Sequence, residues 1–342
     1  MSMSSLGDLE TKYFYALTPE VIDQALIVKG IRPSGRVFAL NSLENRVYEV
    51  EVFKHDLLVH PYSSESVVVK FYRPGRWSKE ALQEEHSFLL ELRELEIPVI
   101  APLMVEGKTL FECPTTGFFY AIFPKMRGRL KDELQAEEIE QIGRMIGRIH
   151  NAGAAQVFKA RPVFNPQNYI EAHFETLTKA DFLPQTTVEH YLSVARQLSN
   201  LITPSFQHFQ NQRIHGDLHR GNIIWTSDGP WIVDFDDCVF GPKEQDLWLL
   251  LPGRDDYSRQ EHELFMKGYH SMAREDVHLS LYTIEALRSI RMIHFNGWIA
   301  RRWQDPTFKK TYSAFDTQNY WETQLLDIKE QLGQLQDAAY AY

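Results

Sequence analysis

The segment from Ile214 to Asp237 reads IHGDLHRGNIIWTSDGPWIVDFDD. Within it, the β-prone runs IIW and WIV lie on either side of a short turn that contains glycine, a pattern that predicts a β-hairpin. Such a hairpin would bring Asp217, Asn222 and Asp234 to one end of a small sheet. Two carboxylates and an amide gathered in this way suit a hard cation such as Mg²⁺, which takes oxygen ligands and often shares them with phosphate.

The chain around this segment has the composition of a soluble globular protein. Its 342 residues are too many for one small core, so two lobes are expected. Hydrophobic residues make up 44% of the chain and charged residues 24%. No apolar run approaches the roughly 20 residues of a membrane span, and the first residues lack the basic and apolar regions of a secretory signal. We therefore expect no membrane partner.

Charge and cysteine content narrow the possibilities further. A net charge of -10 disfavours a general nucleic-acid-binding protein, whose affinity comes largely from Lys and Arg that neutralise phosphates. We therefore expect no nucleic-acid partner. The two cysteines, Cys113 and Cys238, give neither a disulfide framework nor a zinc spacing, and the cytoplasm is the expected compartment.

Predicted strands and helices are unevenly distributed along the chain. Strands are predicted at 36–40, 46–52, 66–72 and 118–123, with helices at 19–29 and 77–95. Further helices are predicted at 137–150, 188–201, 246–251, 260–275, 279–303 and 318–338, with Thr186 or Thr187 as the N-cap of the second of these. The sequence thus predicts an N-terminal strand-rich lobe at 1–123, a hinge at 124–128 and a helical lobe at 129–342.

A candidate ion pair lies upstream of the central segment. Lys70 ends a β-branched run, so its ammonium group would emerge from a largely apolar sheet. The helix that follows carries two neighbouring acids, Glu84 and Glu85, and either could pair with Lys70.

Three interpretations of the central segment compete. In the first, Asp217 and Asn222 are turn formers and Asp234 only ends a strand. In the second, His215, Asp217 and His219 are the metal ligands of a hydrolase, because alternate residues of a strand share one face. In the third, the segment catalyses phosphoryl transfer. The third is favoured by the spacing H-x-D-x-x-x-x-N, by the Asp-Phe-Asp that follows an apolar strand, and by the upstream Lys and Glu.

Residues 215–222 and 233–236 resemble the corresponding motifs of the aminoglycoside phosphotransferase and choline kinase branch of the protein-kinase-like fold. The resemblance spans nearly the full length, with further matching stretches at 40–48, 69–77, 84–86, 241–242, 245–248 and 301–306. It implies an α+β, two-lobed fold with a β-rich nucleotide-binding N-lobe and a helical C-lobe. Within this branch the chain is most similar to bacterial stress-response kinases. That similarity implies a monomeric, cytoplasmic, autophosphorylating serine/threonine protein kinase that uses ATP and Mg²⁺.

The resemblance also implies roles for the residues that match its motifs. Asp217 would be the catalytic proton acceptor that orients the attacking hydroxyl. Asn222 and Asp234 would hold Mg²⁺, and Asp234 would also count as catalytic because the metal neutralises charge on the β- and γ-phosphates.

On the N-terminal lobe, three more residues match positions that contact ATP. Lys70 would bind the α- and β-phosphates, held by Glu85 rather than Glu84 because Glu85 begins a Glu-x-x-Phe-Leu pattern. Ser42, in the turn between the first two strands, would contact ATP as well.

Other residues support the site without taking part in the chemistry. We expect Asp246 to brace the catalytic loop by accepting backbone N–H bonds, and His215 and His219 to fix its geometry. Arginines near helical spacing at 288, 291, 301 and 302 form either an ion-paired face or a substrate-facing basic patch.

The chain departs from typical protein kinases at three points. The turn at 41–45 contains no glycine, so the side chains of Ser42, Asn41 and Asn45 could help to hold phosphate. Gly216 replaces the Arg of H-R-D, and no A-P-E segment follows Asp234. We therefore hypothesise that activity needs no phosphorylation of an activation loop.

The motifs fix the reaction more firmly than the acceptor. A protein Ser or Thr hydroxyl is the favoured acceptor, on resemblance alone. A small-molecule phosphotransferase acting on an amino alcohol, sugar or aminoglycoside is the main alternative, and a nucleotide-binding regulator with little turnover is a third.

Overall fold

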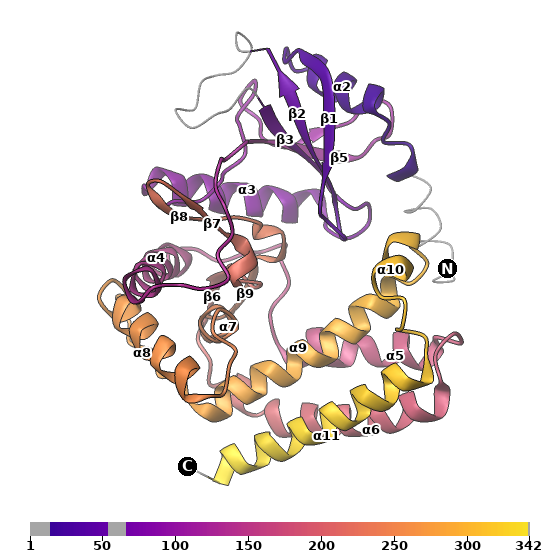
Figure 1. Cartoon of the computed structure of the whole chain (residues 1–342), viewed down its shortest axis with the longest axis vertical. Helices are drawn as coiled ribbons and strands as arrows, with labels where there is room; N and C mark the ends of the chain where they lie inside the picture. Colours follow the sequence, from indigo (N-terminus) through magenta and orange to yellow (C-terminus); the bar gives the residue numbers. More distant parts are fainter. Residues whose placement is uncertain (1–13, 54–65, 341–342) are drawn as a thin grey trace.

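The computed structural model describes residues 14–53 and 66–340, which form two lobes (Figure 1). The N-terminal lobe contains strands β1 (Pro33–Leu40), β2 (Arg46–Val52), β3 (Ser66–Phe71), β4 (Phe111–Glu112) and β5 (Phe119–Pro124), with helices α2 (Pro19–Ile27) and α3 (Lys79–Glu94). The C-terminal lobe contains helices α4 (Ala136–Gly153), α5 (Ala172–Lys179), α6 (Gln185–Ile202), α7 (Glu244–Leu249), α8 (Asp256–His270), α9 (Leu281–Arg302), α10 (Pro306–Thr311) and α11 (Gln318–Tyr340). Its short strands are β6 (Asn211–Ile214), β7 (Ile223–Thr226), β8 (Gly229–Ile232) and β9 (Val239–Pro242). The predicted β-rich first lobe and helical second lobe are confirmed.

The N-terminal lobe is an antiparallel sheet with the strand order β1-β2-β3-β5-β4. Side chains alternate across β3, so Val69 and Phe71 join the core formed with α2. Lys70 and Tyr72 therefore lie on the opposite face. On that side α3 runs between the sheet and the second lobe (Figure 1), and its Leu82 packs against Tyr72. This alternation directs the Lys70 ammonium toward α3.

The predicted hairpin is confirmed as β7 and β8, which pair with Ile223 opposite Ile232. A second small sheet, which the sequence analysis did not predict, pairs β6 with β9. The first lobe is attached to the hairpin, because the backbone N–H of Ile100 donates to the carbonyl of Ile232 over 3.2 Å. The segment from Ile214 to Asp237 therefore lies where the two lobes meet.

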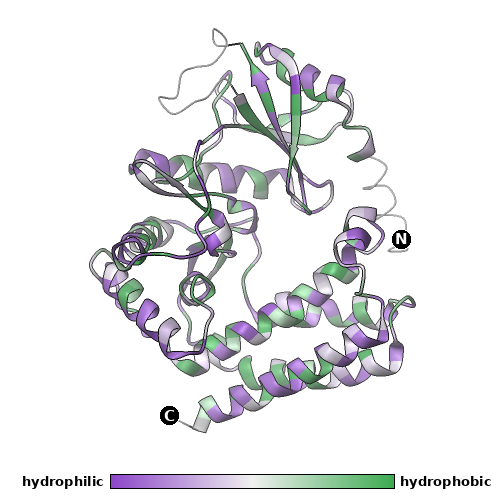
Figure 2. Ribbon diagram, viewed as in Figure 1, coloured by the Kyte–Doolittle hydropathy of each residue, from purple (hydrophilic) through white to green (hydrophobic). Residues whose placement is uncertain are grey.

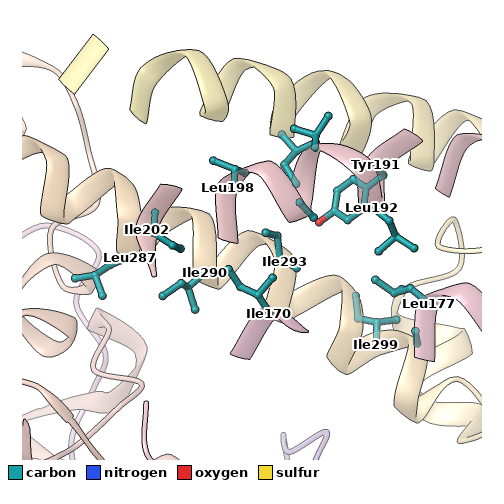
Figure 3. Packing of buried hydrophobic residues seen from close by; sticks show 14 of the residues in the cluster. Ile170, Leu177, Tyr191, Leu192, Leu198, Ile202, Leu287, Ile290, Ile293 and Ile299 are labelled. Atoms are coloured by element: carbon teal, nitrogen blue, oxygen red, sulfur yellow. The ribbon is translucent and has the colours of Figure 1, made fainter. Parts of the chain in front are cut away.

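The C-terminal helices pack on one another around a large apolar core. Figure 3 shows α6 and α9 side by side, with Leu198 and Ile202 of α6 facing Ile290 and Ile293 of α9. In Figure 2 these helices carry hydrophobic and hydrophilic residues interspersed along their length, as expected of amphipathic helices with one buried side. The core fixes α9, which presents Arg291 to the segment described above.

Several predicted boundaries differ from those observed. Helix α6 begins at Gln185, after Pro184, so neither Thr186 nor Thr187 is its N-cap. Thr187 is instead buried and accepts a hydrogen bond from the Gln318 amide of α11 over 2.8 Å. Helices α5 and α10 were not predicted. Among the described residues, no helix combines the length and apolar character needed to cross a lipid bilayer.

Candidate active site

The loop between β6 and β7 is held by one buried carboxylate. Asp246 Oδ2 accepts from the backbone N–H of His215, and its Oδ1 from that of Gly216, each over 2.8 Å. Gly216 has φ +86°, and a side chain there would overlap the carbonyl oxygen of Asp237. Glycine is therefore required at this position. The predicted bracing role of Asp246 is confirmed.

The two histidines of the loop bond to its own backbone. His215 Nε2 donates to the carbonyl of Val233 over 2.9 Å, which leaves Nδ1 to accept from the Asp217 N–H over 3.3 Å. His219 Nδ1 accepts from the N–H of Gly221 over 3.0 Å. In the described part of the chain, no three His, Cys, Asp or Glu side chains gather as ligands of one metal. Both ring nitrogens of His215 are thus engaged by the loop backbone, which agrees with histidines that fix loop geometry rather than bind a metal.

The Asp217 carboxylate is bound by a cation from another element. Arg291 Nη1 on α9 lies 2.7 Å from Asp217 Oδ1, and His219 Nε2 lies 3.6 Å from Oδ2. Burial alone would raise the pKa of Asp217. Its contact with His219 and the charge of Arg291 outweigh burial and hold that pKa well below its usual range. Asp217 therefore carries a negative charge at neutral pH.

Asn222 lies just before β7 and Asp234 just after β8, at the base of the hairpin. The Asn222 carbonyl accepts from the N–H of Val233 over 3.0 Å, and its side-chain amide donates to the carbonyl of Asp217 over 2.9 Å. Asp234 adopts the left-handed region with φ 62°, unusual for a non-glycine residue and frequent at functional sites. Its side chain is 57% exposed. An amide oxygen and an accessible carboxylate are suitable ligands for a hard divalent cation.

Lys70 is surrounded by three carboxylates. Its Nζ lies 3.1 Å from Asp236 Oδ1, 3.3 Å from Asp234 Oδ1 and 3.6 Å from Glu85 Oε1. Burial alone would lower the pKa of Lys70, but these three charges outweigh it and raise the pKa above its usual value. The predicted pair of Lys70 with Glu85 is present, and Lys70 remains a cation.

The two neighbouring acids of α3 have different partners. Glu85 is fully buried and pairs with Arg161 Nη2 over 2.7 Å as well as with Lys70. Glu84 lies on the other side of the helix, where its carboxylate accepts from the backbone N–H groups of Lys159, Ala160 and Arg161 over 2.6–3.0 Å. Only Glu85 therefore lies beside Lys70.

The turn between β1 and β2 is fastened to the C-terminal lobe. Glu44 binds Arg302 Nη2 over 2.6 Å and accepts from Trp298 Nε1 over 2.8 Å, both on α9. Burial would raise the pKa of Glu44, but Arg76, Arg302 and Arg73 together lower it to about 2. Ser42 lies on the same turn and makes no hydrogen bond within the described residues.

One expectation about this turn is wrong. Asn45 is buried, and its Oδ1 accepts from the backbone N–H of Arg73 over 3.0 Å. Its side chain therefore holds the turn against the strand end and does not face a phosphate site.

Arginines account for most of what the sequence analysis missed. Arg76 pairs with both Asp236 and Asp237, and Arg161 bridges Glu85 to the backbone carbonyl of Asp236 over 2.5 Å. Asp236 was visible in the motif Asp-Phe-Asp but was given no role. Arg76 lies in the matching stretch 69–77 but has no predicted role, and Arg161 lies outside every matching stretch, so no local signal distinguishes Arg161 from a surface arginine.

Three of the four arginines of α9 are ion-paired, as the first of the two expectations predicts, whereas Arg301 Nη2 lies 3.3 Å from His173 Nδ1. Arg291 binds Asp217, Arg302 binds Glu44, and Arg288 Nε donates to Glu285 Oε2 over 3.1 Å. Two of these three pairs lie in the candidate site, so the face is also directed toward it.

A cavity of about 230 Å³ opens beside Asp217. It is lined by residues of both lobes, among them Arg76, Asp217, Arg291, Trp298 and Tyr312. Aromatic side chains with a few charged groups are typical of a site that orients a ligand. The carboxylate of Asp217 thus faces a space that could admit an acceptor group.

Comparisons with known proteins show which family the chain is similar to. The sequence model of the "Phosphotransferase enzyme family" (APH) matches residues 39–280. The "Serine/threonine protein kinase RdoA" of Salmonella typhimurium (strain LT2) is 36% identical over 319 residues, which cover 93% of each chain. The "Stress response kinase A" of Escherichia coli (strain K12) is 35% identical over 325 residues, which cover 95% of each chain.

A solved structure is similar at the level of the fold. Amicoumacin kinase hAmiN, in complex with AMP-PNP, Ca²⁺ and Ami, superposes with a TM-score of 0.62 over 83% of this chain and 88% of its own. The two sequences are 19% identical. The predicted kinase-like fold is confirmed by this likeness.

Proposed function

Because the chain belongs to the phosphotransferase enzyme family, we propose that it transfers the γ-phosphoryl group of ATP, with Mg²⁺, to a serine or threonine hydroxyl of a protein. The observation that carries the phosphoryl transfer is the meeting of Lys70, Glu85 and Asp234 next to the loop that bears Asp217. A cation for phosphate, oxygen ligands for a metal and a carboxylate base are the parts that this reaction requires.

Each residue has a defined task in this proposal. Lys70, held by Glu85 and Asp236, binds the α- and β-phosphates. Asn222 and Asp234 hold Mg²⁺, which supplies positive charge to the phosphate oxygens when it is bound. Asp217 orients the acceptor hydroxyl and accepts its proton, while Ser42 contacts ATP from the β1–β2 turn.

Arg291 must give up part of its contact with Asp217 when an acceptor binds. The pair lies at the cavity beside Asp217, and Arg291 is 42% exposed there. An arginine at this position is able to turn from the carboxylate to the charge of a transferred phosphoryl group. We therefore place Arg291 among the residues that contact the acceptor side of the site.

The protein acceptor is supported by the relatives. The Salmonella typhimurium protein, 36% identical over 93% of this chain, is described as a serine/threonine protein kinase. Autophosphorylation, and a role in a stress response, are proposed on the same ground. These two proposals rest on the relatives alone, whereas the proposal of phosphoryl transfer is also supported by the site.

The absence of an activation-loop switch is also part of the proposal. An Arg at position 216 would be the usual partner for a loop phosphate, but φ +86° and the nearby Asp237 carbonyl admit only glycine there. Protein dephosphorylated at every site should retain full activity. An absolute requirement for a phosphosite after Asp237 would contradict this part of the proposal.

A small-molecule acceptor is the second candidate, and the cavity beside Asp217 favours it. A space of about 230 Å³ with an aromatic lining would fit a compact alcohol better than a folded protein surface. The structurally similar amicoumacin kinase is named for a small-molecule substrate.

Radiolabelled ATP separates the candidates. Label on the chain itself or on added protein, with phosphoserine or phosphothreonine identified by mass spectrometry, supports the protein kinase. Label found only on an added amino alcohol, sugar or aminoglycoside supports the second candidate. Mg²⁺-dependent ATP binding without transfer to either would leave only a nucleotide-binding regulator.

A further inference from the structure

A second and larger cavity lies on the N-terminal lobe, behind α3. Its volume is about 660 Å³, and it shares no lining residue with the cavity beside Asp217. One wall is the outer side of α3, and the other is the segment 104–112, which leads into β4. Its size falls within the range of about 300–1,000 Å³ that is typical of small-molecule sites.

The lining of this cavity is basic in a chain of net charge -10. Lys29, Lys79 and Lys108 contribute three ammonium groups, against a single lining carboxylate, Glu112. Within the described residues neither Lys79 nor Lys108 takes part in an ion pair. Lys29 has a partner in Glu106 at 3.6 Å, but that acid is 73% exposed, so the pair is worth little in water.

The remaining lining residues are partly polar and partly apolar. Gln83, Ser87 and Thr109 offer side-chain donors, while Leu90 and Phe119 are among the apolar residues. Ammonium groups in a partly apolar cavity suit an organic molecule with one or two anionic groups. Phosphate and carboxylate groups share this chemistry.

Two hydrogen bonds lead from this cavity to Tyr72, whose ring lies beside Lys70. His86 on α3 is buried, with Nδ1 2.9 Å from the Thr109 hydroxyl and Nε2 2.7 Å from the Tyr72 hydroxyl. The Tyr72 ring lies 5.0 Å from the Lys70 ammonium. Glu85, the partner of Lys70, is the neighbour of His86 in the same helix.

The state of His86 makes these two hydrogen bonds sensitive to what the cavity holds. Burial and the charges of Lys70 and Arg161 lower the pKa of His86 to about 3, so the ring is neutral, with one donor and one acceptor nitrogen. If the Thr109 hydroxyl donates to a bound anion, it must accept from His86 Nδ1–H. His86 Nε2 then accepts from the Tyr72 hydroxyl, so only the tautomer with the proton on Nδ1 is allowed.

We propose that the cavity behind α3 binds a small organic anion with phosphate or carboxylate groups, and that the bound anion raises the affinity of the chain for ATP. The anion would fasten segment 104–112 to α3 through Lys79, Lys108 and Thr109. When α3 is held in this way, Glu85 stays in place beside Lys70. ATP then binds a site that is already ordered, and less conformational entropy is lost on binding. The effect on ATP affinity rests on the proposed function, whereas anion binding does not.

Binding is tested on the full chain without nucleotide or Mg²⁺. The probes are citrate and 3-phosphoglycerate, and sodium chloride at equal ionic strength is the salt control. Calorimetry should give a binding curve with the wild type and at least tenfold weaker binding with Lys79→Gln/Lys108→Gln. The matched variant Lys310→Gln/Lys329→Gln, which removes two exposed lysines of the C-terminal lobe, should bind as the wild type does.

The outcomes are distinct. The anion site is overturned if neither probe binds the wild type, if both double variants bind equally, or if only an acidic peptide such as hexaglutamate binds. Coupling is tested by the Kd for ATP, which a saturating probe should lower several-fold in the wild type and leave unchanged in His86→Ala. An unchanged Kd in the wild type would overturn the coupling. A chain that binds a probe but no ATP would refute the proposed function and leave the anion site standing.

Discussion

Asp236 Oδ1 lies 3.1 Å from Lys70 Nζ, closer than either of the carboxylates of Asp234 and Glu85. Asp236 is 3% exposed and also binds Arg76, whereas the Asp234 side chain is 57% exposed. The two acids of the Asp-Phe-Asp motif therefore differ in kind. Asp236 anchors the cations of the N-terminal lobe, and Asp234 is left accessible to a metal.

Replacing the anchor should cost stability. Asp236→Asn leaves Lys70 and Arg76 buried with one counter-charge fewer, and breaking such a buried pair typically costs about 3–5 kcal/mol. The neighbouring Asp237→Asn is the matched control. It also loses a contact with Arg76, but the Asp237 side chain is 44% exposed, where ion pairs contribute about 0–1 kcal/mol. Urea unfolding of the two variants measures both losses. Equal losses would show that Asp236 is not an anchor.

The two adjacent acids of α3 give a second matched pair. Glu85→Gln removes the buried partner of Lys70 and Arg161 and should lower kcat/KM for ATP by about 10²-fold, the order expected when a phosphate-binding group is misplaced. Glu84→Gln weakens hydrogen bonds to the backbone of 159–161 and should affect mainly stability, by about 1–3 kcal/mol. Steady-state kinetics beside unfolding curves will tell them apart. If Glu84→Gln proved the more damaging to kcat/KM, the assignment of Glu85 would be wrong.

Local patterns predicted the parts of the fold that depend on local chemistry. The β7–β8 hairpin follows from two β-prone runs and their turn, and α3 from apolar residues at helical spacing. The role of Asp246 follows from its place just after the hairpin, because a carboxylate at that point reaches the N–H groups of the loop. The small sheet of β6 and β9 was missed because its four-residue strands show no clear alternation.

The sequence does not predict the contacts of residues whose position depends on how the two lobes pack. Arg161 lies in a loop without a motif, yet its guanidinium reaches Glu85. The sequence places Glu44 in a turn and Arg302 on a helix with other arginines, and only the packing of α9 against the β1–β2 turn brings them together. The prediction that Glu85 rather than Glu84 pairs with Lys70 is confirmed. The roles of Lys70 and Glu85 in the chemistry stay predictions.

Asp217→Asn should abolish turnover and spare nucleotide binding. The amide keeps the shape of the side chain but accepts no proton, and loss of a general base typically lowers kcat by about 10²–10⁴-fold. ATP affinity should change little, since Lys70 and Asp234 are untouched. Asp234→Asn, by contrast, should lose Mg²⁺-dependent ATP binding as well. Turnover of Asp217→Asn near that of the wild type would refute its assignment as the base.

The contact between Glu44 and Arg302 should couple the two lobes energetically. Glu44 is 11% exposed and Arg302 13% exposed, so their pair is shielded from water. A double-mutant cycle of Glu44→Gln and Arg302→Gln, read from free energies of unfolding, should give a coupling energy of about 1–3 kcal/mol, in the upper part of the range for residues in contact. The exposed pair of Lys267 and Glu140 is the comparison, with at most about 1 kcal/mol expected. A coupling for Glu44 no larger than this would mean that the turn is not fastened to α9.

Acid should destabilise the protein through its buried neutral histidines. Burial, with the nearby His294 and Arg301, lowers the pKa of His173 to about 2, against 6.5 for an ordinary histidine. Below pH 6.5, therefore, His173 binds a proton in the unfolded chain but not in the folded chain, and the free energy of unfolding falls. The loss reaches about 2 kcal/mol at pH 5 for one such group.

His173→Gln tests this through the difference between variant and wild type. Glutamine does not titrate, so the variant should lose about 2 kcal/mol less than the wild type when the pH falls from 7 to 5. The absolute stability of the variant does not matter, because only this change with pH is compared. His208→Gln, which removes an exposed histidine, controls for the substitution itself. If His173→Gln and wild type lose equal stability between pH 7 and 5, His173 must accept a proton in the folded chain, and its hydrogen bond to His294 over 2.9 Å would have to rearrange below neutral pH.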